Sequence, residues 1–173
     1  MTDMRHHEDA MPELELTRTK EDRRLYTLGD IGTLRLTGFW SRSATARAGN
    51  RTWEITRSGF WQMHVDATDE GGVTVGEFEP RGGLRRGGTL LWGGREYGLR
   101  PSSSWRERYA LLAGDLELAV LDGKGWGKRP VAVTVDDPAL VEPGLLLFAT
   151  FVVRGLAEDA SSASSGGIVA ATS

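Results

Sequence analysis

The run Leu145–Val153, LLLFATFVV, constrains the fold most, because Thr150 is its only polar residue. A helix that is apolar on every side has to be buried on every side. As a helix the run would be about 14 Å long, whereas the hydrocarbon core of a bilayer is about 30 Å thick. Charged residues, Glu142 and Arg154, stand close to both ends. We therefore expect a buried element and not a transmembrane span.

The residues around this run favour a helix over a strand. Pro143 suits the first turn of a helix, where its missing N–H has no partner to lose. Downstream, Leu156, Ala157 and Ala160 continue an apolar side. We therefore predict a helix near residues 143–160. A buried strand is the alternative, since valine and phenylalanine favour strands.

Upstream of this helix the chain consists of short alternating runs separated by turn residues. The 23 glycines suit many tight turns. In VTVGEFE we expect Val73, Val75 and Phe78 to point inward. About twelve such runs, with turn signals roughly every eight to twelve residues, are typical of an antiparallel sandwich or barrel. The runs are ELELT, RLYTL, TLRLT, TARA, RTWEIT, FWQMHVD, VTVGEFE, TLLW, REYGLR, ERYALL, LELAVLD and KRPVAVTVD.

The strands and the helix together predict one architecture. A closed barrel of about twelve strands has an interior too wide for its own side chains to fill. An apolar helix threaded through it would fill that space. We therefore predict a mostly β protein, an antiparallel barrel of residues 13–160 enclosing the C-terminal helix. Polar and Ser/Ala/Gly-rich composition predicts flexible tails at 1–12 and 161–173.

Composition excludes several classes of site. A chain of 173 residues suits one domain. The net charge of −3 argues against nucleic acid as a partner. The absence of cysteine excludes disulfides, thiolate metal sites and cysteine nucleophiles. The first residues contain no apolar segment like that of a secretory signal, which predicts a cytoplasmic location. Peripheral contact with a membrane is compatible with that location.

Three stretches carry a resemblance to a known superfamily: TLLWGGREYGLRP, RYALLAGDLELAVLDGKGWGKRPVAVTVDD and GLLLFATFVV. With the order of strands and helix, they resemble the Tubby C-terminal domain, the phospholipid scramblases and the LURP-one-related proteins, most of all bacterial and plant LURP-one-like members. The resemblance covers roughly residues 13 to 160. It implies a twelve-stranded barrel around a hydrophobic C-terminal helix, acting as a non-catalytic binding module.

The departures from this superfamily concern function. Animal scramblases have a cysteine-rich lipidation segment and an acidic calcium-binding segment, and neither has a counterpart here. Tubby domains bind phosphoinositide head groups in a basic pocket whose residues do not match this chain one by one. No site residue is therefore carried over from the superfamily.

Two glycine-rich loops are the best candidates for ligand binding, because cations gather in them. A tryptophan between cations suits a membrane surface or an anionic ligand, since the indole lies at the interface while the cations meet phosphates. Solvated hairpin tips are the plainer alternative. The first loop, EPRGGLRRGG, contains Arg81, Arg85 and Arg86, and the second, GKGWGKRP, contains Lys124, Trp126, Lys128 and Arg129.

A catalytic alternative rests on His64 and Asp66, which share one face of a predicted strand. A histidine oriented by a carboxylate is half of a hydrolase relay, which predicts a small hydrolase or isomerase working in a barrel cavity. No nucleophile motif such as G-x-S-x-G accompanies the pair. A surface polar pair is the other interpretation.

The remaining polar clusters suggest structural roles. Asp66, Asp69 and Glu70 lack the spacing of an EF-hand loop and suit a solvated hairpin tip. Asp136 or Asp137 suits the cap of a turn at Pro138. No glycine cluster has the P-loop pattern, which argues against a nucleotide cofactor. Since the acidic clusters also lack the spacing of a metal-binding loop, we expect no metal and no cofactor.

The sequence thus predicts a non-catalytic binding or scaffold module. Its expected partner is an anionic phospholipid head group or another protein, with nucleic acid disfavoured. A structural partner that docks through its surface strands is a further hypothesis, and the hydrolase is the enzymatic alternative.

Overall fold

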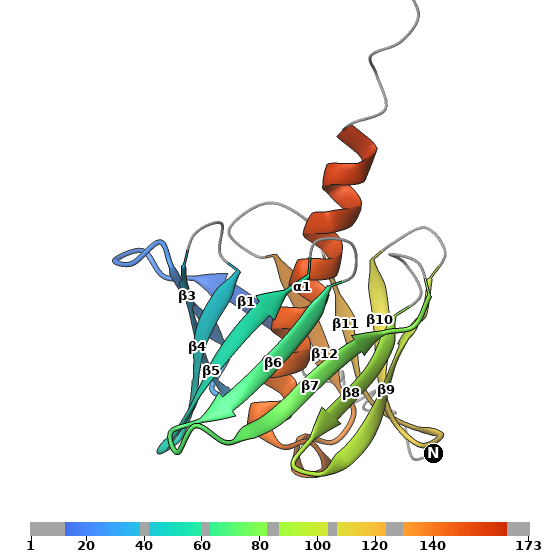
Figure 1. Ribbon diagram of the computed structural model, residues 1–173, viewed down its shortest axis with the longest axis horizontal. Helices are drawn as coiled ribbons and strands as arrows, with labels where there is room; N and C mark the ends of the chain where they lie inside the picture. Colours follow the sequence, from blue (N-terminus) through green and yellow to red (C-terminus); the bar gives the residue numbers. More distant parts are fainter. Residues whose placement is uncertain are drawn as a thin grey trace, which may run out of the picture.

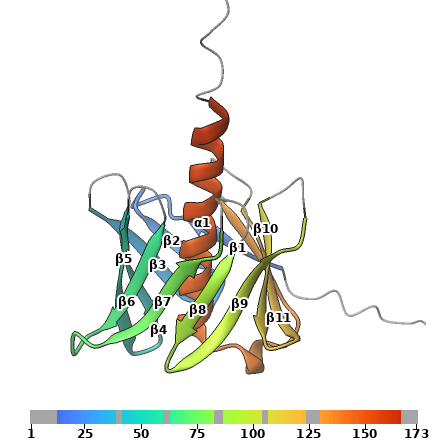
Figure 2. The same cartoon turned by 45° about the vertical axis from the view of Figure 1, so that its right-hand side comes forward.

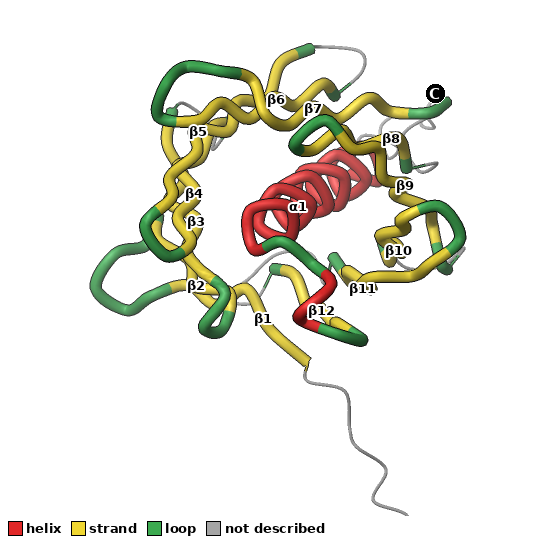
Figure 3. Tube along the Cα trace, turned by 90° about the horizontal axis from the view of Figure 1, so that it is seen from below, coloured by secondary structure: helices red, strands yellow, loops and turns green. Residues whose placement is uncertain are grey.

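The computed structural model describes residues 13–38, 42–59, 63–82, 87–103, 107–123 and 130–165. These residues form a closed antiparallel barrel of twelve strands with one long helix, α1, inside it (Figures 1 and 3). Each strand is hydrogen-bonded to its neighbours in sequence, and β1 closes the ring on β12. The predicted fold, a mostly β barrel enclosing a C-terminal helix, is therefore confirmed.

The strands follow one another with short connections, as the alternating runs predicted. A short 3-10 helix, Pro138–Leu140, links β12 to α1, which spans Pro143–Ser165. The strands are β1 Glu13–Arg18, β2 Leu25–Leu28, β3 Gly32–Thr37, β4 Ser43–Ala48, β5 Arg51–Ser58, β6 His64–Asp69, β7 Thr74–Pro80, β8 Gly88–Trp92, β9 Arg95–Pro101, β10 Arg108–Ala113, β11 Leu116–Asp122 and β12 Val131–Val135.

The lumen of the barrel is filled by α1 and by the inward side chains of the strands. Every residue from Leu145 to Val153 is at most 3% exposed. On one wall β4 presents only Ala44 and Ala46, whereas β7 and β8 present the larger Phe78 and Trp92. The buried Thr150 hydroxyl donates to the carbonyl of Leu146 at 2.7 Å. Burial on all sides is thus the reason why LLLFATFVV has no polar face.

The helix begins where the sequence predicted and ends later. Pro143 is its first residue, as expected. It continues to Ser165, five residues beyond the predicted end at Ala160. In this added turn, the hydroxyls of Ser161 and Ser162 donate to the carbonyls of Ala157 and Glu158, four residues earlier in the same helix. Of the helices in the described part of the chain, none is long and apolar enough to cross a bilayer.

The prediction for β7 was wrong at one position and partly wrong at another. Phe78 is fully buried, but Val73 is 60% exposed and lies before the strand, while Val75 is half-buried. Alternation places Gly76, not a valine, on the inner face with Phe78. A Cβ on Gly76 would lie 2.6 Å from the Trp92 ring. The indole of Trp92 fills the space that a side chain would take there.

The strand directions give the barrel two different ends. Because neighbouring strands are antiparallel, alternate connections lie at the same end. We call them the loop end and the turn end. The loop end, where the last turns of α1 project beyond the strands (Figure 2), has the connections 19–24, 38–42, 59–63, 81–87, 102–107 and 123–130. The turn end has the shorter connections 29–31, 49–50, 70–73, 93–94 and 114–115, and also the segment that leads into α1.

Candidate functional site

The two basic loops predicted from the sequence belong to the loop end. Of their residues, Arg81 is described and is exposed. Strands β7 and β8 flank the first loop, and β11 and β12 flank the second, so both loops start and finish at this end. The other predicted residues, Arg85, Arg86, Lys124, Trp126, Lys128 and Arg129, lie outside the described residues.

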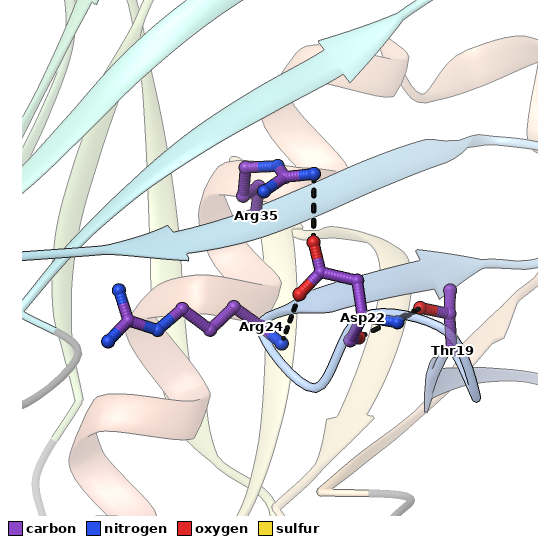
Figure 4. Close-up of polar contacts among 4 residues, drawn as sticks. All are labelled: Thr19, Asp22, Arg24 and Arg35. Atoms are coloured by element: carbon purple, nitrogen blue, oxygen red, sulfur yellow. Dashed lines mark hydrogen bonds and ion pairs between the residues drawn. The ribbon is translucent and has the colours of Figure 1, made fainter.

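A third basic segment at the loop end, the β1–β2 connection, was missed by the sequence analysis. Its conformation is held by Asp22, which forms an ion pair with Arg35 of β3 at 2.8 Å and accepts a hydrogen bond from the backbone N–H of Arg24 at 2.9 Å (Figure 4). Thr19 also stabilises the connection, since its hydroxyl donates to the carbonyl of Asp22 at 2.8 Å. The connection is therefore anchored to the barrel rim.

This anchoring leaves cations facing outward. The side chain of Arg24 points away from Asp22 and Arg35 (Figure 4). Lys20 and Arg23 are exposed beside it. In the sequence the segment KEDRR has three basic and two acidic residues, a mixture that conceals its basic character. The fold neutralises Asp22 with Arg35 from another strand, and only that pairing reveals the surplus of positive charge.

One ion pair and one cation–π contact fasten α1 to the strands at the loop end. Arg57 of β5 donates to both carboxylate oxygens of Asp159 at 2.5 Å. Arg154 pairs with Glu158 at 2.6 Å, and its guanidinium lies 5.6 Å from the centre of the Tyr26 ring. These contacts join the helix to β5 and β2 where it leaves the barrel, so the helix is held at a fixed height above the rim.

The Glu158 carboxyl should make stability depend on pH. Burial raises the pKa of Glu158 above 4.5, although Arg154 and Arg57 lower it. A raised folded-state pKa means that the folded protein binds this proton more tightly than the unfolded chain. The contribution of Glu158 to stability is therefore present below pH 4.5 and is lost as the pH rises through the folded-state pKa. The variant Glu158→Gln should gain stability relative to wild type over that rise, measured by urea unfolding. A constant difference between the two proteins across pH would contradict this.

A groove of ≈ 300 Å³ crosses the outer wall of the barrel below the loop end. It runs over β8 and β9, and two exposed arginines, Arg81 and Arg100, stand at its upper end. Gly98 lies in the middle of the groove, and Glu96 lies near its lower end, beside the β10–β11 turn at Gly114. Arg81, a binding residue predicted from the sequence, therefore lines this groove.

The hypothetical catalytic pair lies on the outer face of β6 and not in the lumen. His64 Nε2 is 3.2 Å from Asp66 Oδ1, and both side chains are about 40% exposed, at 41% and 38%. Ser58 of β5 is directly opposite His64 in the strand register, but among the described residues no side-chain hydrogen bond joins the two. Neither described cavity includes these residues. The arrangement is that of a solvated polar pair.

At the turn end, polar groups fix the start of α1. Glu142 accepts a hydrogen bond from the Trp92 indole at 3.0 Å and pairs with Arg51 at 2.7 Å. The Arg51 guanidinium lies 5.0 Å from the centre of the Trp53 ring. An open cavity of ≈ 540 Å³ adjoins this cluster, between Trp92, Tyr97 and the segment 138–143. Trp53 and Trp92 are buried core residues.

The acidic turns have structural roles. Asp69 accepts hydrogen bonds from the backbone N–H groups of Gly71 and Val73, both at 2.9 Å, and so shapes the β6–β7 turn. Asp137 accepts from Ala139 at 2.9 Å and caps the 3-10 helix, which confirms the second of the two cap assignments. Among the residues that the structure describes, no group of three or more histidine or acidic side chains could hold a metal ion.

Comparison of the chain with protein-family models, with curated proteins and with solved structures finds no match. Functional inference therefore rests on the chemistry of the loop end and of the outer wall.

Proposed function

We propose that this protein is a non-catalytic binding module of the Tubby/LURP-one-like fold, and that its loop end contacts anionic lipid head groups. One observation carries the proposal. The exposed cations Lys20, Arg23 and Arg24 are anchored at the same end of the barrel to which both predicted basic loops belong.

The filled lumen supports an external binding surface. The residues of α1 within the barrel are buried against the inner faces of the strands. Ligands are therefore expected on the outside or at the ends. The net charge of −3 disfavours attraction by the whole molecule, so a membrane contact has to come from a local cluster of cations. Each cation near an anionic surface contributes about 1 kcal/mol.

The resemblance to lipid-associated superfamily members points in the same direction, and peripheral contact with a membrane from the cytoplasm follows from the proposal. A protein partner at the loop end is the second candidate, because a charged rim with a projecting helix also suits protein docking. The hydrolase hypothesis has less support, since His64 and Asp66 lie on an exposed sheet face away from the described cavities.

Vesicle co-sedimentation tests this proposal. The wild-type protein should pellet with phosphatidylcholine vesicles that contain phosphatidylserine and not with phosphatidylcholine alone, and less so at high salt. In the double variant Arg23→Glu/Arg24→Glu, the loss of two cations should weaken binding about thirtyfold or more. A second variant reverses Arg85, Arg86, Lys128 and Arg129 to glutamate and should also lose binding.

The matched control reverses two cations at the turn end, Arg47→Glu/Arg95→Glu. Both side chains are exposed on strands and have no ion pair with any described residue. This control has the same net charge as Arg23→Glu/Arg24→Glu but should keep wild-type binding. If both double variants lost vesicle binding equally, binding would depend on the overall charge of the protein and not on the loop end. Absence of wild-type binding to either kind of vesicle would end the lipid proposal.

A further inference from the structure

The open cavity of ≈ 540 Å³ lies at the turn-end mouth of the barrel. On one side is the β8–β9 hairpin, and on the other is the segment that crosses the mouth from β12 to α1 (Figure 3). The volume is in the range of pockets that bind small molecules, and the mouth of a barrel is a common place for them. The cavity is lined by Trp92, Gly93, Arg95, Tyr97 and residues 138–143.

Strand β9 contributes a cation and an aromatic ring to this cavity. In the strand register Arg95 pairs with Trp92. Tyr97 pairs with Leu90 in the same hairpin. Directly opposed side chains of antiparallel strands lie on one face of the sheet, and both Trp92 and Leu90 are buried core residues. Arg95 and Tyr97 therefore lie on the inner face, two residues apart, with their Cα atoms about 7 Å from one another.

The guanidinium of Arg95 has no hydrogen bond or ion pair with any residue that the structure describes. Two carboxylates are its neighbours on the barrel. Glu96 follows it in β9 and by alternation belongs to the outer face. Asp115 lies across from it at the β10–β11 turn, three residues beyond the pair of Leu112 and Gly98. Since neither carboxylate lines the cavity, the donors of Arg95 are available to an anionic group inside it.

The other wall of the cavity is apolar and held in place. None of the three residues of the 3-10 helix is buried, and Leu140 is 57% exposed. Asp137 caps this helix, and the Leu140 N–H donates to the Asp137 carbonyl at 3.1 Å. Glu142, at the other end of the segment, is fixed by Trp92 and Arg51. A preformed wall lowers the ordering cost of binding, and an exposed leucine gains from being covered.

We propose that this cavity binds a small aromatic monocarboxylate, with the carboxylate on Arg95 and the ring against Tyr97 and Leu140. A guanidinium can pair with a carboxylate through two parallel hydrogen bonds, and a ring can stack on the tyrosine. One or two carbon atoms between carboxylate and ring suit the short separation of Arg95 and Tyr97 along β9. The carboxylate of Glu142 offers only acceptor oxygens, so the cavity favours one anionic group over two.

Isothermal titration calorimetry with 3-phenylpropionate tests the role of the cation. The wild type should bind it saturably, and Arg95→Gln should weaken binding about tenfold or more, since a charge-assisted pair is lost. The neutral analogue 3-phenylpropionamide should bind the wild type more weakly by a similar factor. Arg47→Gln is the matched control, because Arg47 is another exposed strand arginine at the turn end and does not line the cavity. Its affinity should equal that of the wild type.

A second pair of variants tests the apolar contact. Leu140→Gln should weaken binding about fivefold, since part of the apolar cover of the ring is lost. Leu116→Gln is its control, because Leu116 is 56% exposed at the same end of the barrel but does not line the cavity. Both side chains are exposed, so both variants should fold normally, and thermal unfolding checks this. Hexanoate, which has a carboxylate but no ring, should bind the wild type less tightly than 3-phenylpropionate.

This site and the proposed lipid surface are tested independently. Arg23→Glu/Arg24→Glu should keep carboxylate binding, whereas Arg47→Glu/Arg95→Glu should lose it and still bind vesicles. Absence of saturable binding of both phenylacetate and 3-phenylpropionate by the wild type would overturn the proposal. Equal affinity of Arg95→Gln and wild type, or tighter binding of hexanoate than of 3-phenylpropionate, would also overturn it.

Discussion

Replacing Phe148 by alanine is expected to lower the free energy of unfolding by about 3–5 kcal/mol. The Phe148 side chain is fully buried in the lumen, and its ring centre is 5.4 Å from that of Trp92. The surrounding wall is a closed ring of hydrogen-bonded strands, which cannot collapse into the vacated volume without losing backbone pairing. The full cost of a cavity should therefore appear, and chemical denaturation measures it.

The control for this prediction is Leu116→Ala. Leu116 is also a large apolar residue in a regular element, but it is 56% exposed on β11. Its replacement should change stability by no more than about 0.5 kcal/mol. If Phe148→Ala and Leu116→Ala had equally small effects, α1 would not be the packed centre of the barrel.

Replacing Gly144 by leucine should have the second-largest effect, about 1–3 kcal/mol of destabilisation by overpacking. A Cβ at this first turn of α1 would lie 2.5 Å from the Trp92 ring and 2.8 Å from the Trp53 ring. The two rings pack together with their centres 5.7 Å apart, and Glu142 and Arg51 hold them in place. Neither indole can move aside without losing a polar partner.

The matched control for Gly144→Leu is Gly98→Leu, because Gly98 faces an open groove. Thermal unfolding followed by tryptophan fluorescence should show a lower melting temperature and altered emission for Gly144→Leu only. Wild-type emission and stability in Gly144→Leu would contradict the packing of α1 against the two tryptophans.

Sequence alone predicted the fold because its strongest signal is global. A run from Leu145 to Val153 without a polar face needs burial on every side, and a barrel of about twelve strands needs something to fill it. A helix enclosed by the barrel meets both requirements. The same reasoning misplaced Val73, because the inward position in β7 belongs to Gly76, and only the position of Trp92 explains why a glycine is there.

The candidate sites were less predictable, because they depend on which strands are neighbours. The segment KEDRR has only one more cation than anions, and its basic surface becomes apparent only once Asp22 is seen to pair with Arg35 of another strand. Arg81 and Arg100 lie far apart in the sequence, and only the register of β7, β8 and β9 places them at the same end of the outer-wall groove. Single-sequence patterns contain no register, so neither feature could be predicted from them.

Hydrogen–deuterium exchange with and without phosphatidylserine-containing vesicles tests the filled barrel and the loop-end surface together. Backbone amides from Leu145 to Val153 should exchange slowly in both conditions, since the helix is sealed inside the barrel. Vesicles should increase protection in the loop-end connections 19–24, 81–87 and 123–130 and should leave the turn end unchanged. Rapid exchange of the helix would contradict the filled barrel, and protection confined to the turn end or absent altogether would contradict the loop end as the binding surface.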